Sequence, residues 1–532
     1  MFKQILIANR GEIAIRVMGA CKELGIQTVA VYSDADKHAL HVQQADKAIH
    51  LGPAAPKESY LDMDKIIHAA KQANADAIHP GYGFLSENAS FAAAVTSAGL
   101  TFIGPSAESI RAMGDKAESK IRMKEAGVPT VPGYEGLERE QDFAQAAKEI
   151  GYPVLVKAAA GGGGKGMRVV NEENELHEAI ESARREALHA FGDHRLLIEK
   201  YIAKAHHIEF QVFGDGHGNL VHLFERECSV QRRHQKIIEE TPSPLLTPDP
   251  STRGATPYRA EPQSGQRLRE EMGQAAVAAA NAVNYYNAGT VEFIVDPDTL
   301  EFYFLEMNTR LQVEHPITEY ATALDLVHWQ IRIAAGERFP YSQEQISQRG
   351  HAIECRVYAE DPAHGFLPST GRLLGYIEPR GPGIRVDSGF AAGDEVTHFY
   401  DPLLAKLIVY AENRETAIQR MGAALKEFIV HGVLTNIDFL QAVLRHPDFA
   451  NGKVSTRWVE NNLESGSLLP AMQEQAPALH ILTAALADLT IANRQSSTLA
   501  PGASAGVENR SEPDPYSPWK NPNGFRIGGN NG

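Results

Sequence analysis

The stretch AAAGGGGKGMRVV, residues 158–170, decides how the central part of the chain folds. Its glycines satisfy a dinucleotide-binding fingerprint, read as Gly161-x-Gly163-x-x-Gly166. That fingerprint requires a helix directly after the glycines, so that the helix N-terminus meets the pyrophosphate. Here the glycines lead into Met-Arg-Val-Val, which favours a strand. A P-loop is also excluded, because Lys165 precedes a glycine where that motif needs Ser or Thr.

The remaining interpretation is two strands joined by a glycine-rich tip. Backbone N–H groups exposed at such a tip can fold over phosphates. Glycine loses more conformational freedom on ordering than any other residue, so a purely structural turn would rarely use four in succession. A surface turn without a ligand is the alternative. We expect a phosphate-binding lid.

The start of the chain alternates between strand and helix patterns. Apolar runs at 4–8, 28–33, 75–79 and 101–104 predict strands, and residues 12–24 predict a helix. Such alternation is typical of a doubly wound, largely parallel sheet, whose ligands lie beyond the carboxyl ends of the strands.

A second pattern, TVEFIVDPDTLEFYFLEMN at 290–308, predicts an antiparallel hairpin that turns near Asp298. In that hairpin Glu292 lies opposite or nearly opposite Glu306, and Asn308 shares the face of Glu306. Facing carboxylates repel each other, and a divalent cation between them reverses the penalty. Oxygen ligands suit Mg²⁺ bound to a nucleotide. A solvated strand face is the alternative.

Downstream, TRLQVEHP places Arg310, Gln312 and Glu314 at alternating positions. A guanidinium can hold a small oxyanion with two hydrogen bonds, and a neighbouring carboxylate can accept a proton. An ordinary surface ion pair would show the same residues. A basic run such as residues 229–236 is usually a solvated stretch of surface, and it gains a binding role only if an anion site lies nearby.

Composition limits the class of protein. The formal charge of −16 over 532 residues argues against nucleic acid as the main partner, although a local basic pocket could still bind ATP or bicarbonate. Three widely separated cysteines form no metal motif and fit a reducing compartment. No apolar run is long enough to cross a membrane. We therefore expect a cytoplasmic protein without a membrane or nucleic-acid partner.

Several motifs in one order carry a family resemblance. They are IANRGEIAIR, HPGYGFLSEN, MGDK, VKAAAGGGGKGM, IEKYI, CSVQRRHQK, FLEMNTRLQVEHP and ECRVYAEDP. The chain from residue 1 to about 447 resembles biotin carboxylase, a member of the ATP-grasp superfamily.

The resemblance implies a fold of α/β and α+β type. We expect an N-terminal doubly wound domain at 1–112, an ATP-grasp domain at 113–330 with a mobile glycine-loop lid at about 131–204, and a C-terminal mixed α/β domain at 331–447. A helical extension at 448–492 and a linker or disordered tail at 493–532 follow. The latter is rich in Ser, Gly, Pro, Asn and Ala.

The resemblance also implies roles for individual residues. Lys116 and Lys157 hold ATP phosphates, and the loop around Gly163 and Gly164 closes over them. The other nucleotide-pocket positions are Glu199, Lys200, Tyr201, Ile202, His207, Gln231 and His234. The Mg²⁺ (or Mn²⁺) ligands are Glu292, Glu306 and Asn308, which agrees with the hairpin argument. Lys236, Arg310, Gln312, Val313 and Glu314 form the bicarbonate pocket, and Arg356 lies beside the ureido group of biotin.

The implied reaction is the ATP-dependent carboxylation of biotin by bicarbonate, the first half-reaction of an acyl-CoA carboxylase. No Met-Lys-Met biotinylation motif is present, so we expect the biotin on a carrier protein or domain and a carboxyltransferase on a partner subunit. We also expect a homodimer or a place in a larger complex.

Three points stay open at this stage. The final acceptor could be pyruvate or urea. The protein could instead be another bicarbonate-activating ligase of the carbamoyl-phosphate type, which would share the ATP site. A non-catalytic scaffold is the third alternative, and it would be expected to lose Arg310 or Glu314. The ending DPYSPWKNPNGFRIGG suggests a truncated or split α-subunit, with a stand-alone subunit as the alternative. The Pro-, Ser- and Thr-rich segment 241–270 reads as an inserted loop.

Overall fold

The structure is a computed structural model that describes residues 1–137, 139–158, 167–247 and 264–468, together with residues 482 and 486. Contacts divide the chain into two units, Met1–Glu474 and Gln475–Gly532. All of the candidate site residues belong to the first unit. The expected tail at 493–532 and most of the inserted segment lie outside the described residues. In the described part of the chain, every helix is too short or too polar to cross a lipid bilayer.

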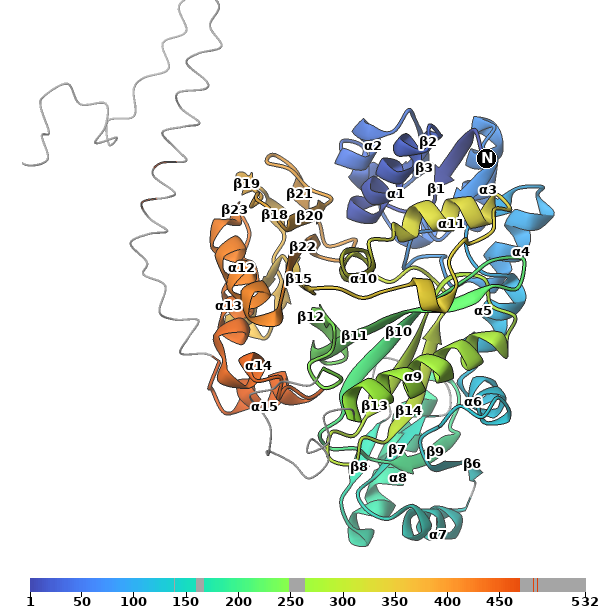
Figure 1. The fold of residues 1–532 in the computed structure, drawn as a ribbon, viewed down its shortest axis with the longest axis vertical. Coiled ribbons are helices and arrows are strands. Elements are labelled where there is room, and N and C mark those ends of the chain that lie inside the picture. Colours follow the sequence, from blue (N-terminus) through green and yellow to red (C-terminus); the bar gives the residue numbers. More distant parts are fainter. Residues whose placement is uncertain (138, 159–166, 248–263, 469–481, 483–485, 487–532) are drawn as a thin grey trace, which may run out of the picture. The chain divides into compact units, whose positions relative to one another are not determined.

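The first domain is a five-stranded parallel sheet with helices on both faces (Figure 1). Its strands, in spatial order, are β3 (Lys47–Gly52), β2 (Gln27–Ser33), β1 (Gln4–Ile7), β4 (Ala77–His79) and β5 (Thr101–Phe102). Its helices are α1 (Gly11–Glu23), α2 (Leu40–Gln44), α3 (Met63–Ala73), α4 (Ala89–Ser97) and α5 (Ala107–Gly114).

Side-chain alternation along β1 explains why both faces of this sheet are covered. Ile5 and Ile7 belong to the core that includes α1, whereas Leu6 belongs to the core that includes α3 and α4. The predicted doubly wound domain is confirmed. The edge strand β3 was not predicted, because half of its residues are exposed and only Leu51 is buried, so its sequence carries a weak apolar pattern.

A four-stranded antiparallel sheet carries the glycine-rich stretch. Its strands, in order, are β6 (Gly133–Leu137), β9 (Leu196–Lys200), β7 (Val154–Ala158) and β8 (Arg168–Val170). Val154 pairs with Val170 across β7 and β8, which confirms the strand–glycine–strand prediction. The tip at 159–166 lies outside the described residues. Helices α7 (Glu140–Ile150) and α8 (Leu176–Phe191) share one core with this sheet, and α6 (Lys116–Glu125) precedes it.

The largest sheet has eight antiparallel strands. In order they are β14 (Phe302–Asn308), β13 (Asn287–Val295), β10 (His206–Gly214), β11 (Leu220–Arg232), β12 (Gln235–Thr241), β15 (His351–Tyr358), β22 (Leu403–Ala411) and β20 (Ile384–Ser388). Because β12 pairs with β15, the sheet continues without a break across residue 330, where we expected a domain border.

The two faces of this sheet differ in chemistry. Ile208 and Phe210 of β10 pack into an apolar core with α9 (Ser264–Asn281). The alternating residues Glu209 and Gln211 point to the opposite face and are also fully buried. That polar face is covered in part by α10 (His315–Thr322), and α11 (Leu326–Ala334) follows it. The polar face is where the candidate site residues gather.

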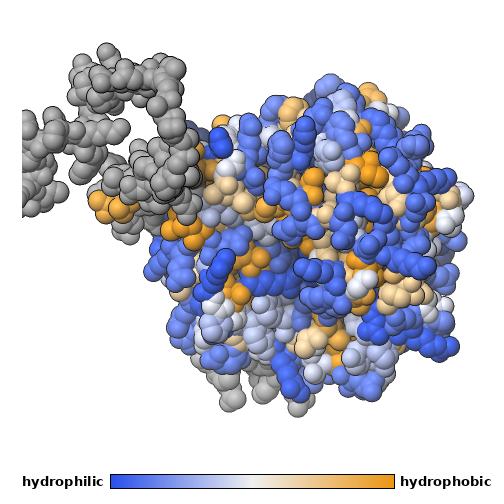
Figure 2. Space-filling view, turned by 90° about the horizontal axis from the view of Figure 1, so that it is seen from above, coloured by the Kyte–Doolittle hydropathy of each residue, from blue (hydrophilic) through white to orange (hydrophobic). Residues whose placement is uncertain are grey.

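The C-terminal part packs α12 (Arg414–Glu427) and α13 (Ile437–Arg445) against β15 and β22. Three two-stranded pairs surround it: β16 (Glu360–Asp361) with β17 (Leu367–Pro368), β18 (Gly371–Arg372) with β21 (Glu395–Val396), and β19 (Gly375–Ile377) with β23 (Ile429–His431). Helices α14 (Pro447–Ala450) and α15 (Trp458–Glu464) begin the expected extension, and Trp458 lies in the same core. Hydrophilic residues cover much of the face seen in Figure 2, with apolar residues in separate groups.

Candidate active site

A row of charged side chains crosses four neighbouring strands on the polar face of the large sheet. Arg226 of β11 is opposite Glu209 of β10, Glu209 is opposite Glu292 of β13, and Glu292 is opposite Glu306 of β14. The predicted facing of Glu292 and Glu306 is confirmed, and the hairpin turns at residues 297–299 as expected. Like charges that face each other across strands repel. Three glutamates in a row therefore need cations nearby.

Lys236 of β12 supplies one of those cations. Its Nζ lies 2.8 Å from Glu292 Oε1 and 2.8 Å from Glu314 Oε1, and it also pairs with Glu209. Burial alone would lower the pKa of Lys236, but the three carboxylates outweigh burial and hold the pKa well above its usual value. The side chain of Lys236 therefore stays charged among the three carboxylates.

Glu314 is a fully buried carboxylate between two cations. Its Oε2 accepts a hydrogen bond from Arg356 Nη2 at 3.1 Å, on the side away from Lys236. Burial would raise the pKa of Glu314, but Lys236, Arg356 and Arg226 outweigh burial and hold the pKa well below its usual value. Glu314 is thus ionised and able to accept a proton.

The two predicted arginines approach this carboxylate from different parts of the chain. Arg356 of β15 is buried and also donates from Nε to Glu239 Oε1 at 2.6 Å. Arg310, in the segment after β14, donates from Nε to Glu87 Oε2 at 2.9 Å. Arg356 is therefore held between Glu239 and Glu314, whereas Arg310 is held by Glu87 and by residues of its own segment.

The segment after β14 is tied back to Glu292 by a short network. Arg310 donates from Nη1 to Gln312 Oε1 at 2.7 Å and from Nη2 to Asn308 Oδ1 at 3.1 Å. Asn308 Nδ2 and Gln312 Nε2 in turn donate to Glu292 Oε1, at 2.8 and 3.3 Å. The predicted bicarbonate and metal residues therefore form one connected cluster.

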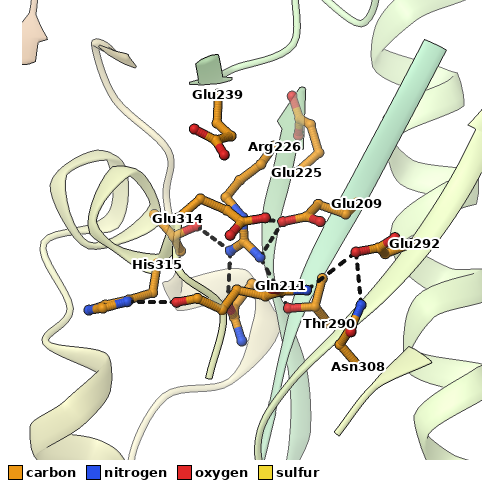
Figure 3. Close-up of polar contacts among 12 residues, drawn as sticks. Glu209, Gln211, Glu225, Arg226, Glu239, Thr290, Glu292, Asn308, Glu314 and His315 are labelled. Atoms are coloured by element: carbon orange, nitrogen blue, oxygen red, sulfur yellow. Dashed lines mark hydrogen bonds and ion pairs between the residues drawn. The ribbon is translucent and has the colours of Figure 1, made fainter. Parts of the chain in front are cut away.

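Sequence reasoning missed several members of this cluster (Figure 3). Arg226 has no exposed surface and donates to Glu209 Oε1 at 2.6 Å. Its other acceptors are Gln211 Oε1, Thr318 Oγ1 and Thr290 Oγ1, at 2.8, 2.9 and 3.1 Å. Lys406 of β22 is equally buried and donates to the carbonyl oxygen of Val313 at 2.9 Å. Charged residues inside otherwise apolar strands were the available signal.

The predicted nucleotide residues are divided between the four-stranded sheet and the eight-stranded sheet. Lys157 Nζ of β7 lies 2.5 Å from Glu199 Oε2 of β9, and Lys120 of α6 pairs with the same carboxylate. His207 of β10 is bonded through Nε2 to Glu292 Oε2 at 2.8 Å. Burial would lower the pKa of His207, but Glu292 outweighs burial and raises the pKa. His207 is therefore bonded to the row of carboxylates.

Other predicted nucleotide residues occupy the connections around β9 and β11. Tyr201 follows β9 and accepts a hydrogen bond from Arg457 Nη1 at 3.1 Å, a contact that the sequence did not suggest. Lys200 and Ile202 flank Tyr201 in the chain. Gln231 is buried opposite Lys236, and His234 lies in the turn between β11 and β12. Lys116 begins α6, its side chain is not described, and Gly163 and Gly164 lie outside the described residues.

The donor set on β13 and β14 fits a magnesium ion. Glu292 and Glu306 face each other across the hairpin, and Asn308 adds an amide oxygen two positions along β14. These are hard oxygen donors of the kind that Mg²⁺ prefers. The repulsion between the two carboxylates is the physical feature that a divalent cation would remove.

Comparison with protein families covers most of the described chain. Residues 1–110 match the biotin carboxylase N-terminal domain. Residues 115–254 and 262–342 match the ATP-binding domain of the carbamoyl-phosphate synthase L chain. Residues 354–461 match the biotin carboxylase C-terminal domain. The three matches follow the order of the expected domains.

Individual relatives agree with these matches. The α subunit of mitochondrial methylcrotonoyl-CoA carboxylase from Dictyostelium discoideum is 49% identical over 529 residues, which are 99% of this chain and 71% of that protein. Biotin carboxylase from a Nostoc species is 52% identical over 460 residues, 86% of this chain and 99% of that protein. The chain spans 60–71% of the length of the first three methylcrotonoyl-CoA carboxylase α subunits that it matches.

A solved structure shows the same fold. The biotin carboxylase domain dimer of 2-oxoglutarate carboxylase from Hydrogenobacter thermophilus, in complex with MgADP, ADP and bicarbonate, is 49% identical with a TM-score of 0.79. The match covers 90% of this chain and all of that domain. With these domains in this order and relatives of this identity, the chain belongs to the biotin carboxylase family.

Proposed function

We propose that this chain transfers a carboxyl group from bicarbonate to biotin at the expense of ATP. The observation that carries the proposal is the position of Glu314, an ionised carboxylate held between the cations of Lys236 and Arg356. A buried base flanked by cations suits a reaction in which a bound anion must lose a proton. Arg310, connected to the same cluster, adds a second anion-binding group.

Bicarbonate is a poor nucleophile, so the site has to activate it. In the proposed reaction the anion binds at Lys236 and Arg310, and Glu314 removes its proton as its oxygen attacks the γ-phosphorus of ATP. The bond from that phosphorus to ADP breaks, which yields carboxyphosphate and ADP. Bicarbonate bound at Lys236 would share the positive charge of that ammonium and so raise the proton affinity of Glu314.

Phosphoryl transfer gathers negative charge, and the site can balance it. Lys116 and Lys157 are the proposed phosphate ligands, with the glycine loop around Gly163 and Gly164 as their cover. Magnesium held by Glu292, Glu306 and Asn308 would neutralise phosphate oxygens when bound. Lys157 is paired with Glu199, so phosphate binding would exchange one anionic partner for another.

The second stage needs a different cation. Carboxyphosphate would break down to CO₂ and phosphate, and the phosphate would take the ureido proton of biotin, whose nitrogen then attacks CO₂. Arg356 is placed to stabilise the negative oxygen of the deprotonated ureido group, since arginine stays charged at any working pH. Arg356 belongs to β15, outside the ATP-binding match, and this is what favours biotin over a carbamoyl-phosphate type of ligase.

We propose an acyl-CoA as the final acceptor. The biotin would arrive on a carrier protein or domain, and a carboxyltransferase on a partner would complete the reaction. The relative and the solved structure described above are equally identical to this chain but carry different acceptors in their names, so the acceptor has to be tested with the partner subunit. A homodimer is proposed from the dimeric state named for that domain. A cytoplasmic location also stays a proposal, because the Dictyostelium relative is named as mitochondrial.

The experiment that tests this function is phosphate release from Mg²⁺ and ATP, with and without bicarbonate and then with free biotin. Turnover that needs bicarbonate and rises with biotin supports the proposal. Turnover that needs bicarbonate but ignores both free biotin and a biotinylated carrier would indicate another bicarbonate-activating ligase.

A further inference from the structure

Glu354 of β15 is a buried carboxyl group to which the proposed reaction gives no task. It has no exposed surface, and neither of its side-chain oxygens has a hydrogen-bond partner among the described residues. A buried carboxylate with no partner is strongly unfavourable, whereas a neutral carboxylic acid is far less so. The surroundings of Glu354 should therefore reveal what keeps it neutral.

The residue directly opposite Glu354 is another glutamate. Glu239 of β12 pairs with Glu354 in the register of the two strands and is also without exposed surface. Glu239 Oε1 accepts a hydrogen bond from Arg356, whereas its Oε2 has no partner among the described residues. Like charges in directly opposed positions are destabilising, and two carboxyl groups in one low-dielectric site retain a proton between them.

The nearest cations are already occupied by other carboxylates. Lys406 of β22 has Glu12 Oε1 at 3.2 Å and Asp387 Oδ2 at 3.6 Å. Arg356 lies two positions along β15 and is shared by Glu239 and Glu314. The charged groups that act on Glu354 are Lys406 of β22, Glu239 of β12, Arg356 of β15 and Glu314, and Glu354 in turn acts on the thiol of Cys355. The groups that face Lys406 in the next layer are Glu12 of α1, to which Tyr82 donates, and Arg385 and Asp387 of β20, and His315 lies close to Lys406 as well.

We propose that Glu354 and Glu239 hold one proton between them, with Glu354 as the neutral acid and Glu239 as the carboxylate that positions Arg356. Glu239 then presents a single negative charge to the guanidinium from one side, and Glu314 does so from the other. Part of the guanidinium is left for the ureido oxygen of biotin. The proposed effect on Arg356, its orientation towards the ureido oxygen, rests on the proposed carboxylation of biotin. The shared proton does not depend on that function.

The electrostatic surroundings agree with this geometry. Burial raises the pKa of Glu354 well above its usual value. Burial also raises the pKa of Glu239, and Arg356 opposes that effect. When the shared proton leaves at high pH, the pair carries two charges, draws Arg356 towards Glu239 and weakens its hold on the ureido oxygen. Glu354 is therefore a positioning residue, and its proton gives biotin-dependent turnover an alkaline limit.

The Glu354→Gln variant separates this proposal from a purely structural role. The amide keeps the shape and the neutrality of the acid but has no proton to lose. We expect biotin-dependent turnover within about tenfold of the wild type near neutral pH, because loss of a required acid or base would cost about a hundredfold or more. The alkaline limb of the pH profile should disappear or move to higher pH. An unchanged alkaline limb in a folded variant would overturn the proposal.

Infrared spectroscopy of the full chain tests the proton without any activity. A protonated carboxyl has a C=O stretch that is separate from the bands of amides and carboxylates. We expect this band near neutral pH in the wild type and in the control Glu395→Gln, whose side chain is exposed on β21, and its loss or weakening in Glu354→Gln. No protonated carboxyl in the wild type near neutral pH, or an equal band in Glu354→Gln, would overturn the proposal. A band that behaves as expected in a protein without bicarbonate-dependent turnover would refute the proposed function and leave the proton pair standing.

Discussion

Replacing Lys236 by methionine should make both turnover and stability depend on pH in a new way. The ammonium has two carboxylate oxygens at 2.8 Å and a third carboxylate bonded to it. At an effective dielectric constant of about 20, each pair at this distance attracts by about 6 kcal/mol before desolvation is subtracted. Removing one member of a buried ion pair has a net cost of about 3–5 kcal/mol. We expect the free energy of unfolding of Lys236→Met to fall by about 3–5 kcal/mol near pH 8.

The sign of the pH dependence follows from the remaining carboxylates. In the wild type the pKa values of Glu292 and Glu314 lie well below 4.5, because Lys236 and its neighbouring cations outweigh burial. Such groups stabilise the fold above their unfolded pKa, and this stabilisation is lost as the pH falls through the folded pKa. Without Lys236, burial dominates and raises the folded pKa values above the unfolded ones. Stability in the variant is then retained at low pH and lost as the pH rises through those values.

Urea unfolding at several pH values measures this effect. The gap in the free energy of unfolding between wild type and Lys236→Met should widen from about pH 5 to about pH 8, while bicarbonate-dependent phosphate release should fall by about a hundredfold or more. Lys236→Arg is the matched variant that keeps the charge. Lys71→Met, at an exposed position of α3, should change stability by less than about 0.5 kcal/mol. An equal gap at both pH values, or retained turnover, would refute the charge-balance argument.

Three other substitutions test separate parts of the site. Arg356→Met should abolish the stimulation of phosphate release by free biotin while bicarbonate-dependent hydrolysis of ATP persists; equal loss of both rates would contradict its assignment to biotin. Glu292→Gln or Glu306→Gln should remove Mg²⁺-dependent turnover with an unchanged circular dichroism spectrum, and normal turnover would rule out the metal assignment. Arg226→Met removes the 2.6 Å partner of Glu209 and leaves Lys236 as its remaining cation, so chemical denaturation should show a loss of about 3–5 kcal/mol in the free energy of unfolding; a loss below about 1 kcal/mol would contradict the stabilising role given to the Arg226–Glu209 pair.

Much of the fold was predictable because the deciding patterns are local. The parallel sheet of the first domain follows from short apolar runs that alternate with helical patterns, and the lid hairpin follows from strand propensity on both sides of the glycines. The facing of Glu292 and Glu306 depends only on strand period and turn position. A strand such as β3, in which half of the residues are exposed and one is buried, carries no comparable signal.

The missing part of the site depends on contacts between distant segments. Arg226 and Glu209 lie only 17 positions apart, but the register of β10 and β11 shifts between Phe210 and Val212, so spacing from the turn does not place them opposite each other. Glu239 meets Glu354 because β12 pairs with β15, 115 positions later in the chain. Neither strand pairing nor register across such a distance can be read from spacing in one sequence. The hydrogen bond from Arg457 to Tyr201 joins segments that are even farther apart, 256 positions along the chain. Resemblance to a family supplied the residues proposed to bind ligands, but not the buried residues that contact them.

The central claim is tested most directly by following labelled carbon from bicarbonate into biotin. The full chain is incubated with isotope-labelled bicarbonate, ATP, Mg²⁺ and free biotin, and carboxybiotin is trapped as its methyl ester and measured by mass spectrometry. We predict labelled carboxybiotin that requires ATP and is absent with Glu314→Gln. The account would be contradicted if ATP hydrolysis depended on bicarbonate but neither free biotin nor a biotinylated carrier, tested in parallel, gained the label.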